Sequence, residues 1–496
     1  MLQQPAATAV QARLAPPREP KLGEIVASRI KQDIADLGWP IGHVFGSQTE
    51  LMRRYEVSRA TLREAVRQVE RHGIARMHTG MGGGLIVQQP AREAAVLALA
   101  AYLELAAVKL HDLLEARSVL EELMITLACE RGGESELAAL SMLVRELRDA
   151  PLASVEADIE MSLRFRRALV SLSRNPALML MLEALYRVSS DLLSSPAETP
   201  QLSTLMLRAR REKIALAEAV IEGDSVQAGL RARASLERAR KALDERVLEL
   251  GLPADTASAL ELIVQSERFG GSAQLKLGHR TSLRIALDAR RAGPGGRLGS
   301  EAQLCERHDV SRAVLREALR TLEPQAIVRA QRGARGGLVA CAPDSTYTIE
   351  LTATYLEYAR LRPRHFYELW RALQIACTPM AAARIDAAGR ARMNRLRSEE
   401  ARPMAPQQRL PTHGRLHALI GELSRNPALA LFMGLLDRVG THYQADPPSD
   451  EIWSRIVASH AELCGLIGAG EAALARRAML RHLKLLDVRV ELLLEA

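Results

Sequence analysis

The sequence is poor in cysteine and in aromatic residues, and it contains no long uninterrupted apolar run. Only five cysteines occur in 496 residues, and no two form a Cys-x-x-Cys pair, which argues against a disulfide framework or a thiolate zinc site. Aromatic residues make up 3%, which favours helices over β-sandwiches and barrels. The longest apolar stretch, residues 94–108, is interrupted by Glu104 and is too short to cross a bilayer. We therefore expect a cytoplasmic, mainly α-helical protein with no membrane partner.

What the chain does contain is an internal duplication. The segment Ser58–Glu70 recurs as Ser311–Glu323 with nine of its thirteen positions identical. A second segment, Leu172–Leu178, recurs unchanged as Leu423–Leu429. The two offsets, 253 and 251 residues, are nearly equal, so the whole architecture is repeated and not one motif alone. A stretch containing Gly, Pro and Ser at residues 252–272 is the expected linker between the copies.

Each copy divides into a short basic segment and a longer helical one, after an N-terminal arm at residues 1–20 that we expect to be disordered. Residues 21–90 carry ten Lys/Arg against seven Asp/Glu, and residues 273–343 carry thirteen against six. Residues 91–251 and 344–496 show long apolar periodicity with few helix breakers, which is typical of helical bundles. The net charge of the whole chain is +8, so the basic excess is confined to the two short segments, as a nucleic-acid reader requires.

The two basic segments have the pattern of a winged helix-turn-helix. In the first copy Ser47 is expected to cap one helix, and Ser58 caps the next after a tight turn at Glu56 and Val57. The second helix carries arginines on its outer face, and arginine can bond guanine bidentately in the major groove. The glycine-rich stretch Gly80–Gly84 separates two short apolar runs, which predicts a β-hairpin wing.

This order of helices, Ser-Arg-x-x-x-Arg-Glu motif and glycine-rich wing resembles the DNA-binding domain of the GntR family of bacterial regulators. The resemblance implies a double-stranded DNA operator as partner. We take as candidate DNA-contacting residues Ser58, Arg59, Thr61, Arg63, Arg67 and Gly80 in copy one, and Ser311, Arg312, Val314, Arg316, Arg320, Gly333 and Arg335 in copy two.

Copy two departs from copy one and from the family in ways that affect its DNA-binding segment. We call this winged helix-turn-helix segment of each copy its reader. The family often has an arginine where this chain has Thr49 and Ala302. Copy two also has residues 324–326, Pro-Gln-Ala, where copy one has residues 71–73, Arg-His-Gly. Proline cannot continue a helix normally, so we expect the second recognition helix to end differently or its wing to be set at another angle.

The helical segments resemble the FCD effector domain of the FadR subfamily, on the basis of Leu114–Arg117, the Asn-Pro pairs at Asn175 and Asn426, and the turns at Gly223 and Gly470. Many FCD domains hold a divalent metal through one Asp and three His. Counting from these landmarks in copy two places all four ligand positions on imidazoles, with a His at the usual Asp position. The expected ligands of a zinc- or nickel-like ion are His413, His417, His460 and His482.

Copy one lacks this ligand set, because the same positions hold Ser162, Arg166, Lys213 and Ser235. We expect no metal there. One hypothesis is that Arg166 and Lys213, with Arg117, bind an anionic effector directly; the alternative is a degenerate pocket retained for packing. Copy two has Trp370 in place of Arg117, so the two pockets are expected to differ in ligand.

The sequence thus predicts two winged helix-turn-helix domains, each followed by an all-α FCD-type bundle, and no enzymatic activity. The resemblance implies a transcriptional regulator, with repression relieved by a small carboxylate. Because one chain supplies two readers, we expect a single-chain pseudo-dimer, which can associate further into a homodimer. Two alternatives stay open at this point: a metal-dependent enzyme using the four histidines, and a scaffold whose readers have decayed.

Overall fold

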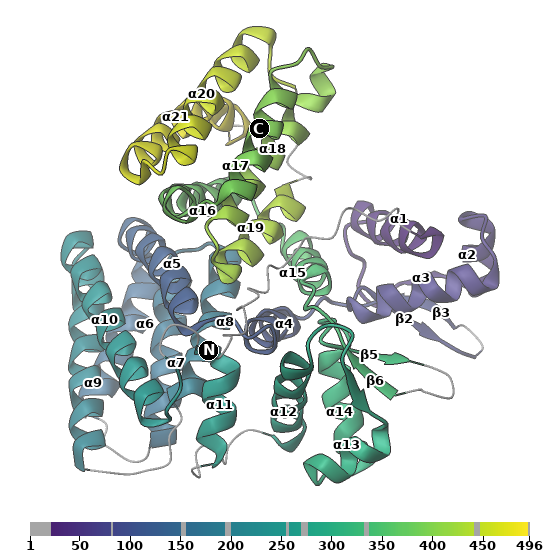
Figure 1. Ribbon diagram of the computed structural model, residues 1–496, viewed down its shortest axis with the longest axis horizontal. Helices are drawn as coiled ribbons and strands as arrows, with labels where there is room; N and C mark the ends of the chain where they lie inside the picture. The colour runs from purple at the N-terminus through teal and green to yellow at the C-terminus, as the bar shows by residue number, and fades with distance from the viewer. Residues whose placement is uncertain are drawn as a thin grey trace, which may run out of the picture. The chain divides into compact units, whose positions relative to one another are not determined.

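The computed structural model describes residues 21–80, 83–149, 155–193, 200–253, 257–268, 276–331, 337–440 and 447–494. In these ranges the chain forms 21 helices and six short strands, which confirms the prediction of a mainly α-helical protein (Figure 1). The residues group into two compact units. One unit contains residues 1–91 and 276–348, and the other contains residues 92–275 and 349–496. The basic segments of both copies therefore share one unit, and the helical segments of both copies share the other.

Each half of the first unit is a winged helix-turn-helix with a small antiparallel sheet. The strand orders are β1-β3-β2 and β4-β6-β5. In copy one the elements are α1 (Leu22–Asp36), β1 (Val44–Gly46), α2 (Gln48–Arg54), α3 (Arg59–Arg71), β2 (Ala75–His78) and β3 (Gly84–Val87). In copy two they are α12 (Leu277–Ala292), β4 (Arg297–Gly299), α13 (Glu301–His308), α14 (Arg312–Leu322), β5 (Val328–Gln331) and β6 (Gly337–Ala340).

The wing hairpins form at the predicted places, but sequence reasoning did not anticipate the third strand of each sheet. In copy one, His78 pairs with Gly84 at the start of the hairpin, and Val44 pairs with Ile86 on the other side of β3. The strand β1 has only three residues and follows a turn, so it lacks the alternating pattern that identifies longer strands.

The second unit consists of helices. Copy one supplies α4 (Arg92–Leu105), α5 (Leu110–Arg131), α6 (Glu134–Asp149), α7 (Val155–Leu172), α8 (Pro176–Leu193), α9 (Pro200–Ile221), α10 (Ser225–Glu249) and α11 (Ala259–Arg268). Copy two supplies α15 (Thr346–Tyr358), whose first three residues belong to the other unit, α16 (Pro363–Arg384), α17 (Ala387–Glu400), α18 (Pro406–Leu423), α19 (Pro427–Gly440), α20 (Asp450–Gly468) and α21 (Ala472–Leu494). Figure 1 shows α5 to α10 running alongside one another as a bundle, with a core of buried Leu, Val, Ala and Met side chains. The stretch predicted as a linker contains the helix α11.

The expected difference between the two recognition helices is present at their C-terminal ends. The helix α3 has 13 residues and is followed by Gly73 at φ +67°, whereas α14 has 11 and stops before Pro324. Ala326 occupies the position equivalent to Gly73 and takes φ +52°. A residue with a Cβ pays a conformational cost in this left-handed region, so copy two contains a strained turn where copy one does not.

Replacing Ala326 by Gly should therefore raise the free energy of unfolding by about 1 kcal/mol, since glycine adopts this backbone conformation without steric cost. Chemical denaturation of the full chain, followed by circular dichroism, measures this change. The reciprocal variant Gly73→Ala is the matched control and should lower the free energy by a similar amount, because nothing lies within 4 Å of the added Cβ. No change in either variant would contradict the assignment of strain to this turn.

Candidate functional site

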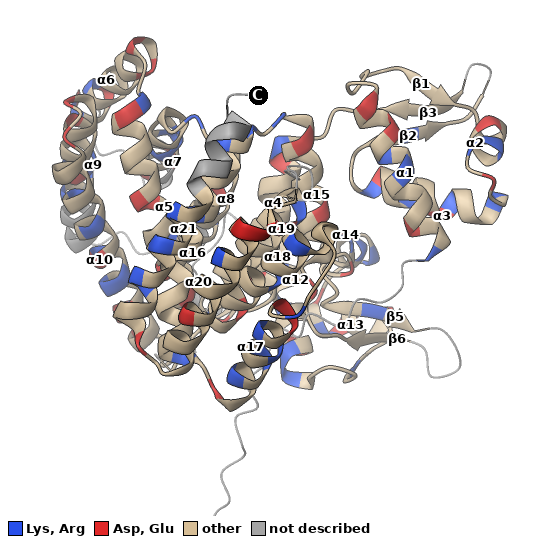
Figure 2. Cartoon of the chain, turned by 90° about the horizontal axis from the view of Figure 1, so that it is seen from above, with Lys and Arg blue, Asp and Glu red and all other residues tan. Residues whose placement is uncertain are grey.

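The N-terminal ends of α3 and α14 are built alike and present arginines to solvent. Ser58 caps α3 by accepting a hydrogen bond from the backbone N–H of Thr61, and Ser311 caps α14 through Val314. The buried side of α3 consists of Leu62, Ala65, Val66 and Val69. On the opposite side of the two helices, the exposed residues are Arg59, Arg63, Arg67, Arg312, Arg316 and Arg320. Figure 2 shows the Lys and Arg positions of the chain in blue.

These arginines differ in how far they are already engaged. Arg67 forms an exposed ion pair with Glu64 at 3.3 Å. Within the residues that the structure describes, Arg59 and Arg63 have no ion-pair partner, and the same holds for the three arginines of α14. Because their guanidinium groups are exposed and unneutralised, they are available to DNA phosphates and base edges.

The two readers differ at the position of Thr61. Its hydroxyl lies 3.0 Å from the hydroxyl of Ser58, so part of its hydrogen-bonding capacity is used inside the cap. Val314 offers only methyl groups at the equivalent place. In the first wing Gly80 adopts φ +116°, which residues with a side chain rarely take. The corresponding candidates in the second wing, Gly333 and Arg335, lie outside the described residues.

The second unit brings the four predicted histidines of copy two together. His413 and His417 lie one turn apart on α18, His460 lies on α20 and His482 on α21. All four are buried, and one nitrogen of each lies within 4.8 Å of the others. The Nε2 atom of His417 is 3.2 Å from Nε2 of both His413 and His482, and Nε2 of His460 is 3.3 Å from that of His482.

This spacing fits a bound divalent ion. Nitrogen ligands about 2.0–2.1 Å from a tetrahedral ion lie roughly 3.3–3.4 Å from one another. Burial and the three neighbouring imidazoles lower the pKa of His417 well below its usual value, and burial does the same for the pKa of His482. Neutral imidazole is the form that coordinates metals. The ring of Trp370 packs against His417, with 4.9 Å between ring centroids.

Sequence reasoning missed two side chains that support these imidazoles from behind. Both carboxylate oxygens of Glu400, the last residue of α17, lie 2.8 Å from Nδ1 of His460. The hydroxyl of Ser459 lies 3.1 Å from Nδ1 of His482. Glu400 is buried, and a buried carboxylate on Nδ1 fixes the ring with Nε2 toward the cluster. No spacing from the histidines identifies Glu400, because it lies on another helix and 60 residues from its partner.

In copy one the equivalent positions form a cluster of charged groups. The Nζ atom of Lys213 contacts the hydroxyl of Ser162 and lies 3.9 Å from the carboxylate of Asp158. The guanidinium of Arg166 lies over the ring of Tyr186, 4.6 Å from its centroid. Three of the four positions that hold histidines in copy two thus carry polar or charged side chains that lie close together here. Ser235 is partly buried on α10, and no contact joins it to the others in the described structure.

Arg117 lies in the same cluster. Its Nε donates to the carboxylate of Glu121 at 2.7 Å, and its guanidinium lies 5.2 Å from the centroid of Tyr186. Arg117 and Arg166 therefore share one aromatic ring, and the predicted effector residues are brought together. Glu121 could have been anticipated as an i, i+4 partner of Arg117. Tyr186 and Asp158 could not, because they come from other helices.

The cluster places several cations in a partly buried location. Among the described residues Arg166 has no ion-pair partner, whereas Arg117 pairs with Glu121 and Lys213 lies near Asp158 and Glu212. Burial lowers the pKa of Lys213 to about 8, and burial with the neighbouring Arg117 lowers the pKa of Arg166 to about 10. In both cases the lowered pKa reflects the free-energy cost of removing a cation from water. An anion bound nearby would offset that cost.

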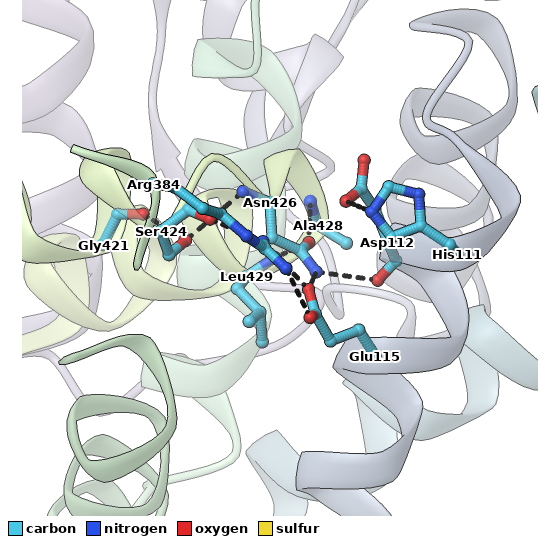
Figure 3. Close-up of polar contacts among 9 residues, drawn as sticks. All are labelled: His111, Asp112, Glu115, Arg384, Gly421, Ser424, Asn426, Ala428 and Leu429. Carbon is cyan, nitrogen blue, oxygen red and sulfur yellow. Dashed lines mark hydrogen bonds and ion pairs between the residues drawn. The ribbon is translucent and has the colours of Figure 1, made fainter. Parts of the chain in front are cut away.

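The two helical domains contact each other through a network that uses the Asn-Pro motif (Figure 3). Nδ2 of Asn426 donates to the backbone carbonyl of Asp112 and to the carboxylate of Glu115, both at 2.9 Å. Arg384 pairs with the same Glu115 at 2.6 and 3.1 Å, and it also donates to the carbonyl of Ser424 at 2.7 Å. One helical domain thus forms hydrogen bonds with the backbone and a side chain at the start of α5 in the other.

The reciprocal contact has the same design with the two copies exchanged. Nδ2 of Asn175 donates to the carbonyl of His365 at 2.8 Å and to Glu368 at 3.4 Å. Arg131 pairs with Glu368 and donates to the carbonyl of Ser173 at 3.2 Å. Each residue corresponds to its counterpart through the internal repeat. The interface is therefore isologous, as in a symmetric dimer, but within one chain.

Among the residues described, no helix is both long and apolar enough to cross a membrane.

Comparison with known proteins gives the same domain content twice over. The model of the FCD domain matches residues 112–238 and 365–485, and that of the bacterial regulatory proteins of the gntR family matches residues 22–84 and 280–336. Together these matches cover more than half of the chain.

Solved structures similar to this chain include a GntR protein of Streptococcus agalactiae, with 23% identity and a TM-score of 0.32, and McbR/YncC of E. coli, with 18% identity and a TM-score of 0.25. The first match covers 45% of this chain and 99% of the other, and the second covers 46% and 99%. No curated protein matches the sequence significantly. On the strength of the paired family-model matches, the chain belongs to the bacterial GntR family of DNA-binding transcription regulators, which are not enzymes, and carries an FCD domain in each of its two copies.

Proposed function

We propose that this protein is a single-chain pseudo-dimer that represses transcription and releases its operator when a small carboxylate binds its FCD domains. Family membership makes operator DNA the partner of the readers and a small molecule the ligand of the FCD domains. The observation that carries the proposal is the reciprocal Asn426–Glu115 and Asn175–Glu368 contact, which joins the two FCD domains as two subunits of a dimer are joined. One chain then brings two readers to one operator.

Both readers are expected to work, because each keeps its capped helix and its exposed arginines. The operator should consist of two similar half-sites, with a difference where Thr61 faces the DNA in one and Val314 in the other. Binding of an effector would favour one of two arrangements of the readers, and repression would be relieved by that shift in population.

Replacing Arg59 and Arg63 by Ala should weaken operator binding, and so should replacing Arg312 and Arg316. Each lost base contact costs about 1–3 kcal/mol, so each double variant should bind at least about tenfold more weakly. Selection of duplexes from a random DNA pool followed by gel-shift titration measures this effect. Arg233→Ala, an exposed arginine of α10, is the control and should bind like the parent chain. If one double variant binds normally, only the other copy reads DNA and the pseudo-dimer proposal is wrong.

We propose that His413, His417, His460 and His482 hold a zinc- or nickel-like divalent ion in copy two. The four buried Nε2 atoms support this, since their spacing suits one ion and burial lowers the pKa of His417 and His482 well below the usual value. When bound, the ion would supply a Lewis-acid contact for a carboxylate effector. Glu400 would compensate for the missing Asp ligand, because its negative charge reaches the site through His460.

Glu400→Gln should weaken metal affinity about 10- to 100-fold, since the ring of His460 loses its charged hydrogen-bond acceptor. Competition with a chromogenic chelator measures the affinity for Zn²⁺ and Ni²⁺. Glu399→Gln is the matched control, because its side chain is 44% exposed and pairs with Arg415 instead. The thermal unfolding of both metal-free variants separates loss of the site from loss of the fold. Equal metal affinity in the two variants would remove Glu400 from the site.

In copy one we propose that Arg117, Arg166 and Lys213 bind the carboxylate effector without a metal. The guanidinium of Arg166, which has no ion-pair partner among the described residues, supports this, and the alternative is a pocket kept only for packing. The proposal requires Lys213 to be charged when the effector binds. Because its pKa is lowered to about 8, its charge is present below that pH and is lost as the pH rises through it.

Effector affinity should therefore fall between pH 7 and pH 9, and Lys213→Met should both weaken binding and flatten this pH dependence. Titration calorimetry against a panel of small carboxylic acids measures both effects. Lys241→Met serves as the control, because this lysine of α10 is exposed and pairs with Glu245 outside the cluster. If Arg166→Met combined with Lys213→Met leaves the effector response of operator binding unchanged, the copy-one pocket has only a packing role.

A further inference from the structure

A cationic cleft lies where the two FCD domains meet, away from both ligand pockets. Its volume is about 670 Å³. Copy one contributes the end of α5 and the turn before α8, and copy two contributes the loop between α15 and α16. The cleft is lined by Glu130, Arg131, Arg174, Pro176, Ala359, Arg360, Arg362, Arg364 and His365. Five of these nine residues are arginines, and only one is acidic.

The arginines of the cleft are not all neutralised. Arg131 and Arg364 share the carboxylate of Glu368, and Arg174 pairs with Glu136 at 2.6 Å. Arg360 and Arg362 are exposed, and neither has an ion-pair partner among the residues described. The cleft therefore retains two free guanidinium groups beside three paired ones. Nδ1 of His365 is buried and has no hydrogen-bond partner in the described part of the chain.

The internal repeat gives the interface a second, equivalent position with the two copies exchanged. The residues at that position differ from those of the cleft. There Ala107 corresponds to Arg360, Lys109 to Arg362 and Asp112 to His365, so the positive charge is reduced. The backbone at that place is also covered, because Leu110 donates to the carbonyl of Ala257 at 3.0 Å. A bridge between Lys109 and Ser258 continues this pairing.

Copy two cannot make the same pairing. Pro363 replaces Leu110, and proline has no N–H to donate. Among the described residues no segment pairs with Arg362 as Ser258 pairs with Lys109. Among the described residues one of the two equivalent places is therefore open, and it carries more arginines than the covered one, which is the reverse of what packing alone would favour.

We propose that this cleft binds a small oxyanion with two or more negative charges, such as an organic phosphate or a polycarboxylate. Its volume lies in the range of about 300–1,000 Å³ typical of small-molecule sites. Guanidinium groups bind phosphate and carboxylate bidentately, and they do so more specifically than lysine. Because both FCD domains line the cleft, the anion holds them together, and the site is distinct from the metal and effector pockets.

Calorimetric titration of the full chain with pyrophosphate, and separately with citrate, tests this proposal. The parent chain should bind at least one of the two probes. The variant R360A/R362A should bind that probe at least about tenfold more weakly, since two charged hydrogen-bond donors are lost. The variant should fold, because Ala107 takes the same left-handed backbone (φ +53° against +51°) and the side chain of Arg362 makes no capping hydrogen bond. Lys109→Ala at the covered place is the matched control and should leave binding unchanged.

The two probes distinguish the possible ligands. Preference for pyrophosphate supports a phosphate-bearing ligand, and preference for citrate supports a polycarboxylate. Absence of binding by the parent chain to both probes overturns the proposal, as does equal binding by R360A/R362A. The proposal is also overturned if the variant binds the probes normally but loses affinity for operator duplex, since the arginines then contact DNA. The titrations with the two probes do not depend on operator binding, so their outcome is separate from that of the proposed function.

Discussion

The arrangement of the second unit depends on a few polar groups buried between its two FCD domains. The amides of Asn175 and Asn426 are fully buried, and a buried polar group left without a partner costs about 1–3 kcal/mol. In the described part of the chain, the NH2 group of each amide donates to the other copy, at a backbone carbonyl and a carboxylate. The arginines Arg131 and Arg384 then neutralise those carboxylates. The two domains must therefore meet in one register to satisfy groups that neither can satisfy alone.

An interface of this kind normally imposes identical partners, because each surface must be complementary to itself. The duplication keeps the self-complementary contact while placing its two sides on different segments of one chain. Residues outside the contact were then free to diverge. The contrast is largest in the two clusters, where four buried imidazoles in copy two correspond to Ser162, Arg166, Lys213 and Ser235 in copy one.

The two pockets show how the same fold supports opposite electrostatic solutions. In copy two, burial keeps His417 and His482 neutral, and one buried carboxylate, Glu400, stands behind the cluster. In copy one, burial lowers the pKa of Lys213 and Arg166, and Arg166 has no ion-pair partner among the described residues. A site of the first kind suits a cation and a site of the second kind suits an anion, because each ligand removes the cost that burial imposes.

The sequence by itself determined the features that depend on local spacing. The serine caps, the recognition helices and the early end of α14 follow from residues a few positions apart, and the four histidines followed from the resemblance to the FCD domain. Only the tertiary structure decided which remote groups meet. Glu400 on His460, Tyr186 between two arginines, the reciprocal Asn contacts and the open cleft at Arg360 all join residues from different helices. Helix periodicity states which face of a helix is buried, but the neighbour that this face meets is set by packing across separations of up to 314 residues.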